Sequence, residues 1–153
     1  MSKIMEAVDV RVPVRTAYDQ WTQFETFPTF MDGVKSVRQL DDSTLEWVAD
    51  VAGREKRWEA KITEQEPDQR IAWTSTEGAH NAGMVTFHPI DDGTSRVTLQ
   101  LDVDPEGPVE NAADALGVVA RRARGDMERF RDFIEARGTE TGAWRGDVHL
   151  RSR

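Results

Sequence analysis

Six strand-like segments follow one another between residues 34 and 103, and this series constrains the fold most strongly. Short turn signals separate them: Asp41-Asp42-Ser43, Ala52-Gly53, Pro67-Asp68-Gln69, Glu77-Gly78 and Asp91-Asp92-Gly93. Two parallel strands need a crossover of about a dozen residues or more, and these connections are much shorter. The series therefore predicts an antiparallel meander over residues 34–40, 44–51, 54–66, 70–75, 81–90 and 94–103.

Further elements flank this meander. Residues 4–12 alternate apolar and polar side chains, which predicts a first strand ending at Pro13, and residues 14–24 carry apolar side chains at helical spacing. Residues 27–31 leave room for one further short turn. After Pro108, apolar side chains recur at helical spacing as far as Ile134, so we expect a long helix closed by Gly138 as its C-cap.

The totals describe one ordinary domain. The chain has 153 residues, of which 38% are hydrophobic and 31% charged, and no apolar run approaches the ~20 residues that span a bilayer. The first residues do not resemble a signal peptide, so we expect no transmembrane segment and a cytoplasmic location. We expect one domain over residues 1–138 and a tail over 139–153, carrying Trp144, that is either docked or flexible.

Charge and residue types exclude several kinds of site. A net charge of −8 disfavours nucleic acid as a partner, and the absence of cysteine removes thiol nucleophiles and Cys-ligated metals. His80, His88 and His149 do not have metal-ligand spacing, and strand alternation places His88 toward solvent. We therefore expect no metal and no cofactor. The sequence does not decide between a monomer and a homodimer.

Three stretches carry a family resemblance. Residues 10–31, with Pro13 between strand and helix and the pair Phe27-Pro28, resemble the opening of polyketide cyclase/dehydrase and coenzyme-Q-binding START-like proteins. Residues 66–73, and residues 83–87 together with 93–99, are similar to central strands of the same family. The resemblance implies an α+β helix-grip fold, in which a curved antiparallel sheet of about seven strands wraps around a long C-terminal helix after two short helices. Its motifs identify the fold better than the activity.

Three tryptophans are the main candidates for ligand contacts. Trp47, Trp58 and Trp73 fall on successive predicted strands and share the faces of apolar neighbours, so all three should point inward. A buried indole needs a partner for its N–H, so three in one core are harder to place than one. They either line a cavity for a flat or polyunsaturated ligand, or simply pack against the long helix.

Strand and helix periodicity extend this set to a predicted cavity between the sheet and the long helix. Its walls are Trp47, Trp58, Trp73, Val85, Phe87 and Leu99, with Leu116 and Ala120 opposite. Phe27, Phe30 and Met31 should close one end, and Ser75 and Asn81 are the polar groups that could fix a carbonyl or hydroxyl of a ligand. A register error of one residue would turn a whole strand's set outward.

The sequence leaves two functions open, and a third is less well supported. The first is binding or carriage of a small apolar molecule, quinone-, polyketide- or lipid-like, in the internal cavity. The alternative, implied by the resemblance, is a polyketide aromatase/cyclase or dehydrase acting on a poly-β-ketone. No catalytic set is evident, because Phe27 stands where the cyclases often have tyrosine, and Tyr18 has the helical spacing of a core residue. A protein-interaction module would need an exposed apolar patch that the sequence does not indicate.

Overall fold

The structure is a computed structural model that describes residues 2–51, 54–77, 81–103, 112–146 and 148–149. Its elements in chain order are β1 (Ser2–Val10), α1 (Val14–Trp21), the 3-10 helix η1 (Phe24–Thr29), β2 (Val34–Asp41), β3 (Thr44–Val51), β4 (Arg54–Glu66), β5 (Arg70–Glu77), β6 (Asn81–Asp91), β7 (Thr94–Val103), α2 (Ala112–Arg137) and β8 (Val148–His149).

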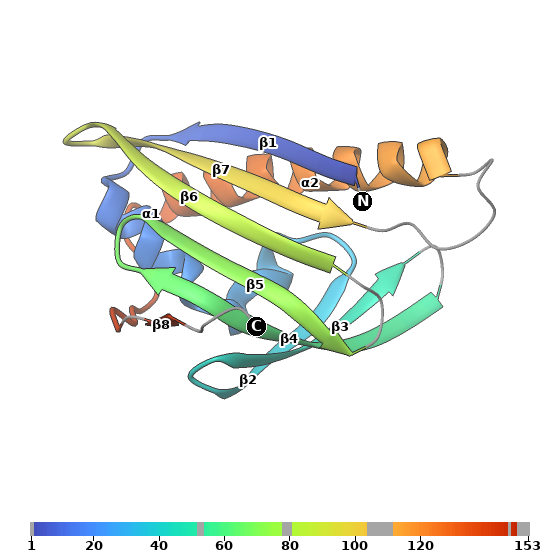
Figure 1. The fold of residues 1–153 in the computed structure, drawn as a ribbon. Coiled ribbons are helices and arrows are strands. Elements are labelled where there is room, and N and C mark those ends of the chain that lie inside the picture. Colours follow the sequence, from blue (N-terminus) through green and yellow to red (C-terminus); the bar gives the residue numbers. More distant parts are fainter. Residues whose placement is uncertain (1, 52–53, 78–80, 104–111, 147, 150–153) are drawn as a thin grey trace.

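The strands form one antiparallel sheet in the order β1-β7-β6-β5-β4-β3-β2, and β8 pairs with β4 beside this path. Every consecutive pair from β2 to β7 is antiparallel, as the short connections require. The strand β1 lies against β7, so the chain returns to its own start before α2 begins. Figure 1 shows α2 behind the sheet, running along β1 and β7. The predicted helix-grip arrangement is confirmed.

The helices begin and end close to the positions that the sequence predicts. Pro13 is extended and precedes α1, and its carbonyl accepts a hydrogen bond from the Ala17 N–H at 3.1 Å. The helix α1 is shorter than expected and is followed by η1. Gly138 has a φ of 75° and its N–H donates to the Ile134 carbonyl at 2.8 Å, so it ends α2 as a C-cap. The expected first turn of this helix lies outside the described residues.

The interior is densely packed under the C-terminal half of α2. Phe130 and Ile134 are fully buried, and Met127 and Ala123 are nearly so. The Phe130 ring lies 5.2 Å from Trp21 of α1 and 5.3 Å from Phe30, with the ring planes inclined. Inclined rings at this separation make favourable edge contacts. This end of the molecule is therefore a core of aromatic side chains from α1, η1 and α2.

The segment after α2 lies against α1 and the sheet, and we call its described residues, 139–146 and 148–149, the C-terminal strap. The Thr141 N–H donates to Gln20 Oε1 at 2.8 Å, and Gln20 Nε2 donates to Thr141 Oγ1 at 3.1 Å. The strap ends in β8, whose pairing covers the part of β4 that extends beyond its pairing with β3. The strap residues that bond to Gln20 cover the side of α1 that faces away from the sheet. Five consecutive residues of α1, 17–21, are therefore buried.

Candidate ligand-binding site

The inner face of the sheet divides into a fully buried aliphatic part and a partly exposed aromatic part. The aliphatic members include Ile62 on β4, Ile71 on β5 and Val85 on β6, each at most 2% exposed. Trp47 and Trp73, by contrast, are half-buried and pack against the edge of the core. On this face the large aromatic side chains are therefore less completely buried than their aliphatic neighbours.

Trp47 and Trp58 form a stacked pair on this face. They are directly opposite each other in the pairing of β3 with β4, so both side chains leave the sheet on the same side. Their ring planes are inclined by only 3°, with centroids 5.9 Å apart. Phe27 lies 5.7 Å from Trp47 and joins this pair to the aromatic core around Trp21. The Trp47 Nε1 is buried and has no hydrogen-bond partner within the described ranges of the chain.

Trp73 lies on the next strand, opposite Gly83 of β6. A Cβ placed on Gly83 would overlap the six-membered ring of the indole. The indole therefore lies directly over the backbone of its neighbouring strand, and a glycine at this position makes that approach possible.

The other side chains expected to line the cavity come from the sheet, from η1 and the residues after it, and from α2, and they differ in burial. Phe27, Phe30, Val85, Phe87 and Leu99 are buried, whereas Met31, Ser75 and Ala120 are half-buried. Asn81 belongs to β6 and Leu116 to α2, but their side chains lie outside the described part of the structure. A ligand contact by any of these residues stays a prediction.

The helix α2 covers the two ends of the sheet unequally. In its N-terminal half Gly117, Val119 and Ala120 are only half-buried, in contrast to the fully buried apolar side chains farther along. Arg122 reaches from this half to the end of β3, where its Nη1 donates to the Asp50 carbonyl at 3.3 Å. Ala49 and Val51 flank Asp50 on β3, the strand that carries Trp47. This contact places the end of β3 that follows Trp47 beside the less covered half of the helix.

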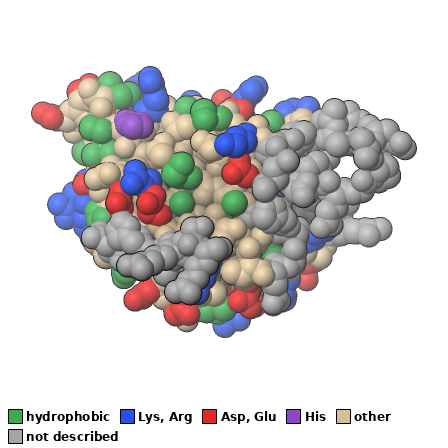
Figure 2. All heavy atoms as spheres, viewed as in Figure 1, with side chains coloured by type: hydrophobic (Ala, Val, Ile, Leu, Met, Phe, Trp, Pro, Cys, Tyr) green, Lys and Arg blue, Asp and Glu red, His purple; other side chains and the backbone are tan. Residues whose placement is uncertain are grey.

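Two hollows are present elsewhere on the surface. One, of about 480 Å³, is lined by Asp9, Arg11, Thr94, Arg131 and Glu135. The other, of about 400 Å³, is lined by residues 28–34 and Arg129, and so includes the predicted contacts Phe30 and Met31. Neither hollow is lined by one of the three tryptophans. On the face shown in Figure 2, acidic and basic side chains are interspersed.

Metal ligands do not gather in the described part of the chain. No group of three or more His, Asp or Glu side chains there could hold a metal ion. His88 is exposed, as strand alternation predicts, and His80 lies outside the described residues. No helix of the described residues is long and apolar enough to cross a membrane.

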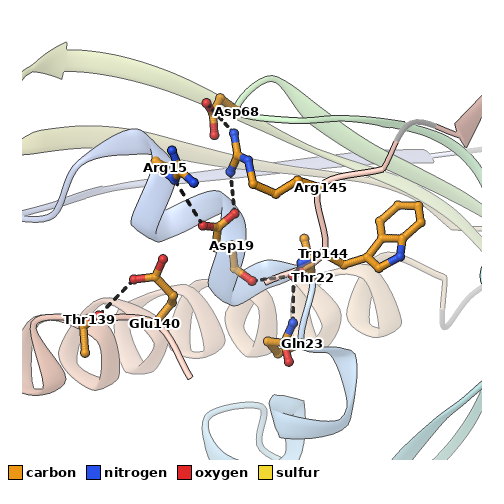
Figure 3. Close-up of polar contacts among 9 residues, drawn as sticks. All are labelled: Arg15, Asp19, Thr22, Gln23, Asp68, Thr139, Glu140, Trp144 and Arg145. Carbon is orange, nitrogen blue, oxygen red and sulfur yellow. Dashed lines mark hydrogen bonds and ion pairs between the residues drawn. The ribbon is translucent and has the colours of Figure 1, made fainter. Parts of the chain in front are cut away.

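A buried polar cluster joins the C-terminal strap to α1, and sequence reasoning missed it (Figure 3). The Asp19 side chain is 2% exposed, and its Oδ1 lies 2.5 Å from Arg145 Nη1. The same guanidinium contacts Asp68 at 2.8 Å and lies 5.5 Å from the centroid of the Tyr18 ring. Burial raises the pKa of Asp19, and Arg145 opposes this rise by favouring the carboxylate.

Tyr18 lies beside this cluster. Its side chain is fully buried and its ring contacts Phe87 edge-on at 5.3 Å. Among the residues that the structure describes, neither its hydroxyl nor the polar atoms of the buried Gln65 side chain have a hydrogen-bond partner. Burial raises the pKa of Tyr18 to about 12, because a phenolate there would lose its hydration. The prediction that Tyr18 is a core residue is confirmed.

This burial predicts a specific alkaline transition. The folded-state pKa of Tyr18 is raised, so its contribution to stability is complete below the unfolded value near pH 10 and is lost as the pH rises toward 12. A rise of about two pKa units corresponds to roughly 2–3 kcal/mol. Tyr18 is the only tyrosine in the chain, so tyrosinate absorbance reports this residue alone.

The matched variant is Tyr18→Phe. It should unfold at neutral pH with nearly unchanged free energy, because it keeps the buried ring and removes only the hydroxyl. Its stability should also fall less steeply than that of the wild type between pH 10 and pH 12. Tyrosine ionisation near pH 10 in the folded wild-type protein would contradict the burial of this group.

Comparison with known proteins places the chain in a family. The family model described as polyketide cyclase / dehydrase and lipid transport matches residues 10–131. The chain belongs to this family. A 17.2 kDa protein of Streptomyces lincolnensis, from the melC2-rnhH intergenic region, is 54% identical over 149 residues, covering 97% of this chain and 99% of that protein.

Solved structures share the fold. A Deinococcus radiodurans protein is 26% identical with a TM-score of 0.70, covering 88% of this chain and 98% of that one. The Zhui aromatase/cyclase from Streptomyces sp. R1128 superposes with a TM-score of 0.77 at 16% identity, covering 94% of this chain and 99% of that one. A START superfamily protein from Mycobacterium smegmatis gives 0.71 at 16% identity, with 88% and 95% covered. At 16% identity these likenesses show the fold alone.

Proposed function

We propose that this member of the polyketide cyclase/dehydrase and lipid transport family binds and carries a small, largely apolar molecule between the sheet and the N-terminal half of α2. The observation that carries the proposal is the partial exposure of Trp47, Trp58 and Trp73 on the inner face, beside aliphatic side chains that are fully buried. Exposed indoles on an interior face cost hydrophobic free energy that a bound apolar molecule would recover.

The uneven cover of α2 supports the same location. Gly117, Val119 and Ala120, which have small or short side chains, are half-buried in this part of the helix, whereas Met127 and Phe130 are buried farther along it. Glycine in a helix interior costs about 1 kcal/mol relative to alanine. Leaving room for a ligand is one reason why a glycine such as Gly117 would be kept in the helix despite that cost. The family description, which includes lipid transport, agrees with a carrier.

Titration of the protein with the naphthoquinone menadione and with the fluorescent fatty acid cis-parinaric acid tests the proposal. We expect at least one probe to bind and change the tryptophan fluorescence. Trp58→Ala should weaken that binding by about tenfold, or ~1.4 kcal/mol, which is the upper end for one aromatic pair. Its unfolding free energy should fall by less than the ~3–5 kcal/mol typical of a packed aromatic core site, because Trp58 is half-buried.

Trp144→Phe is the matched control, since it removes one indole from the C-terminal strap and leaves the inner face intact. Its binding should equal that of the wild type. A flat response to both probes, or a full core-sized loss of stability in Trp58→Ala without any effect on binding, would show that the indoles only pack.

Catalysis on a poly-β-ketone is the alternative function, because the family description also covers cyclases and dehydrases. Such a reaction needs a group that enolises a carbon and a donor that stabilises the enolate. Polar side chains in phase with the tryptophans are Lys56 and Ser75, of which Lys56 is exposed and Ser75 half-buried. Product analysis of a reconstituted polyketide synthase with and without the chain separates the two functions: altered cyclisation would favour catalysis, and unchanged products would favour carriage.

A further inference from the structure

Gly83 stands where a side chain would collide with the ligand-facing aromatic surface. It pairs with Trp73 on one side and with Leu101 on the other, and both of these neighbours are half-buried. Gly83 is in phase with Val85 and Phe87, so a Cβ on it would point to the interior. The nearest atoms to that Cβ all belong to the six-membered ring of Trp73.

An indole displaced from this position has few places to go. On the opposite side of β5, Trp73 pairs with Ile62 of β4, which is fully buried and occupies its own space. Ile71, the next residue on the same face of β5, is 2% exposed and is equally fixed. A side chain at position 83 would therefore drive the indole away from the sheet and toward α2, into the region where we place the ligand.

We propose that Gly83 is a specificity-determining residue of the binding site: because position 83 has no side chain, the Trp73 indole can lie against β6, and this keeps the interior deep enough for a planar ring system. The inference rests on the proposed function. With the indole against β6, space remains beside it for a ligand; with the indole raised, the same space is filled by protein. A purely structural role of the pair, in which the indole shields the glycine backbone from water, would affect stability but not binding.

Four forms of the full chain test this: wild type, Gly83→Ala, Trp73→Leu and the double variant. The probes are menadione and cis-parinaric acid, and the chain has no cysteine that a quinone could alkylate. We expect Gly83→Ala to bind menadione at least about tenfold more weakly than the wild type. The double variant should bind it within about threefold of Trp73→Leu, because the smaller leucine leaves room for the added Cβ.

The outcomes separate this inference from the function on which it rests. A folded Gly83→Ala that binds menadione like the wild type rejects the inference and leaves the proposed function standing. A double variant that binds about tenfold more weakly than Trp73→Leu also rejects it, because the added Cβ would then act without the indole; this comparison decides the question even where Gly83→Ala fails to fold. A wild-type protein that binds neither probe rejects the proposed function and the inference with it.

Discussion

A chain that ends at Gly138 should unfold with a free energy about 3–5 kcal/mol lower than that of the full chain. The deletion removes the two hydrogen bonds between Gln20 and Thr141, and the one from the Trp144 N–H to Thr22 Oγ1. It also removes Arg145 from Asp19 and Asp68. Each neutral hydrogen bond contributes about 1 kcal/mol and a charged one about 1.5–3 kcal/mol. The deletion also removes the conformational entropy cost of ordering the strap, and this offsets part of the loss.

Urea unfolding of both chains measures the difference, and single variants locate it. Arg145→Ala should reproduce a large part of the loss, because it leaves the Asp19 carboxylate buried without its partner. Ala143→Ser changes an exposed residue within the strap and should stay within about 0.5 kcal/mol of the wild type. Equal stability of the truncated and full chains would show that residues 1–138 fold independently and that the strap is only attached.

The strands could be predicted because their signals are local. The ranges 44–51, 54–66 and 94–103 are those of β3, β4 and β7, since turn residues mark their ends and side chains alternate between them. The first strand was expected to end at Pro13, but β1 ends at Val10. Val12 is still buried, and its carbonyl accepts a hydrogen bond from Ser95 Oγ, so the residues beyond the strand remain tied to the sheet without continuing the ladder.

The buried cluster could not be predicted, because its partners are distant in sequence. Asp19 and Arg145 are separated by 126 residues, and neither belongs to a motif. Helical periodicity predicts that one face of α1 is buried, and Ala17 and Tyr18 fit that pattern. Asp19 and Gln20 do not fit it, because the strap covers the opposite face. Half of the eight residues of α1 are polar, as in any amphipathic helix, so the polar pair Asp19-Gln20 is at most a weak signal of such a cover.

For the candidate site, alternation predicts which face a side chain occupies but not how deeply it is buried. Trp47 and Val85 both belong to the inner face, yet the first is half-buried and the second is fully buried. This difference in burial depends on which element covers each side chain from the other side of the interior. The positions of α2 and η1 decide that cover, and the strand sequence does not contain it. Phe27 and Phe30, expected at one end of the cavity, accordingly form part of the aromatic core.

Phe130→Ala should lower the free energy of unfolding by about 3–5 kcal/mol, the range for truncation of an aromatic side chain in a packed core. Phe130 is fully buried, and its ring contacts both Trp21 and Phe30. Its removal leaves a void at the end of the interior where α1, η1 and α2 meet. The surrounding rings are fixed by further contacts with Phe27 and Phe133, so collapse of the void should be incomplete.

Phe130→Leu is the matched control and should cost less, because leucine refills most of the void. Comparison with Trp58→Ala then tests the division of the interior into a packed and an open end. If that division holds, Phe130→Leu lowers stability while its menadione affinity stays at the wild-type value. Trp58→Ala should instead lower the menadione affinity more than it lowers stability. A loss below about 1 kcal/mol in Phe130→Ala would mean that this end is not packed, and the contrast that locates the ligand under the N-terminal half of α2 would fail.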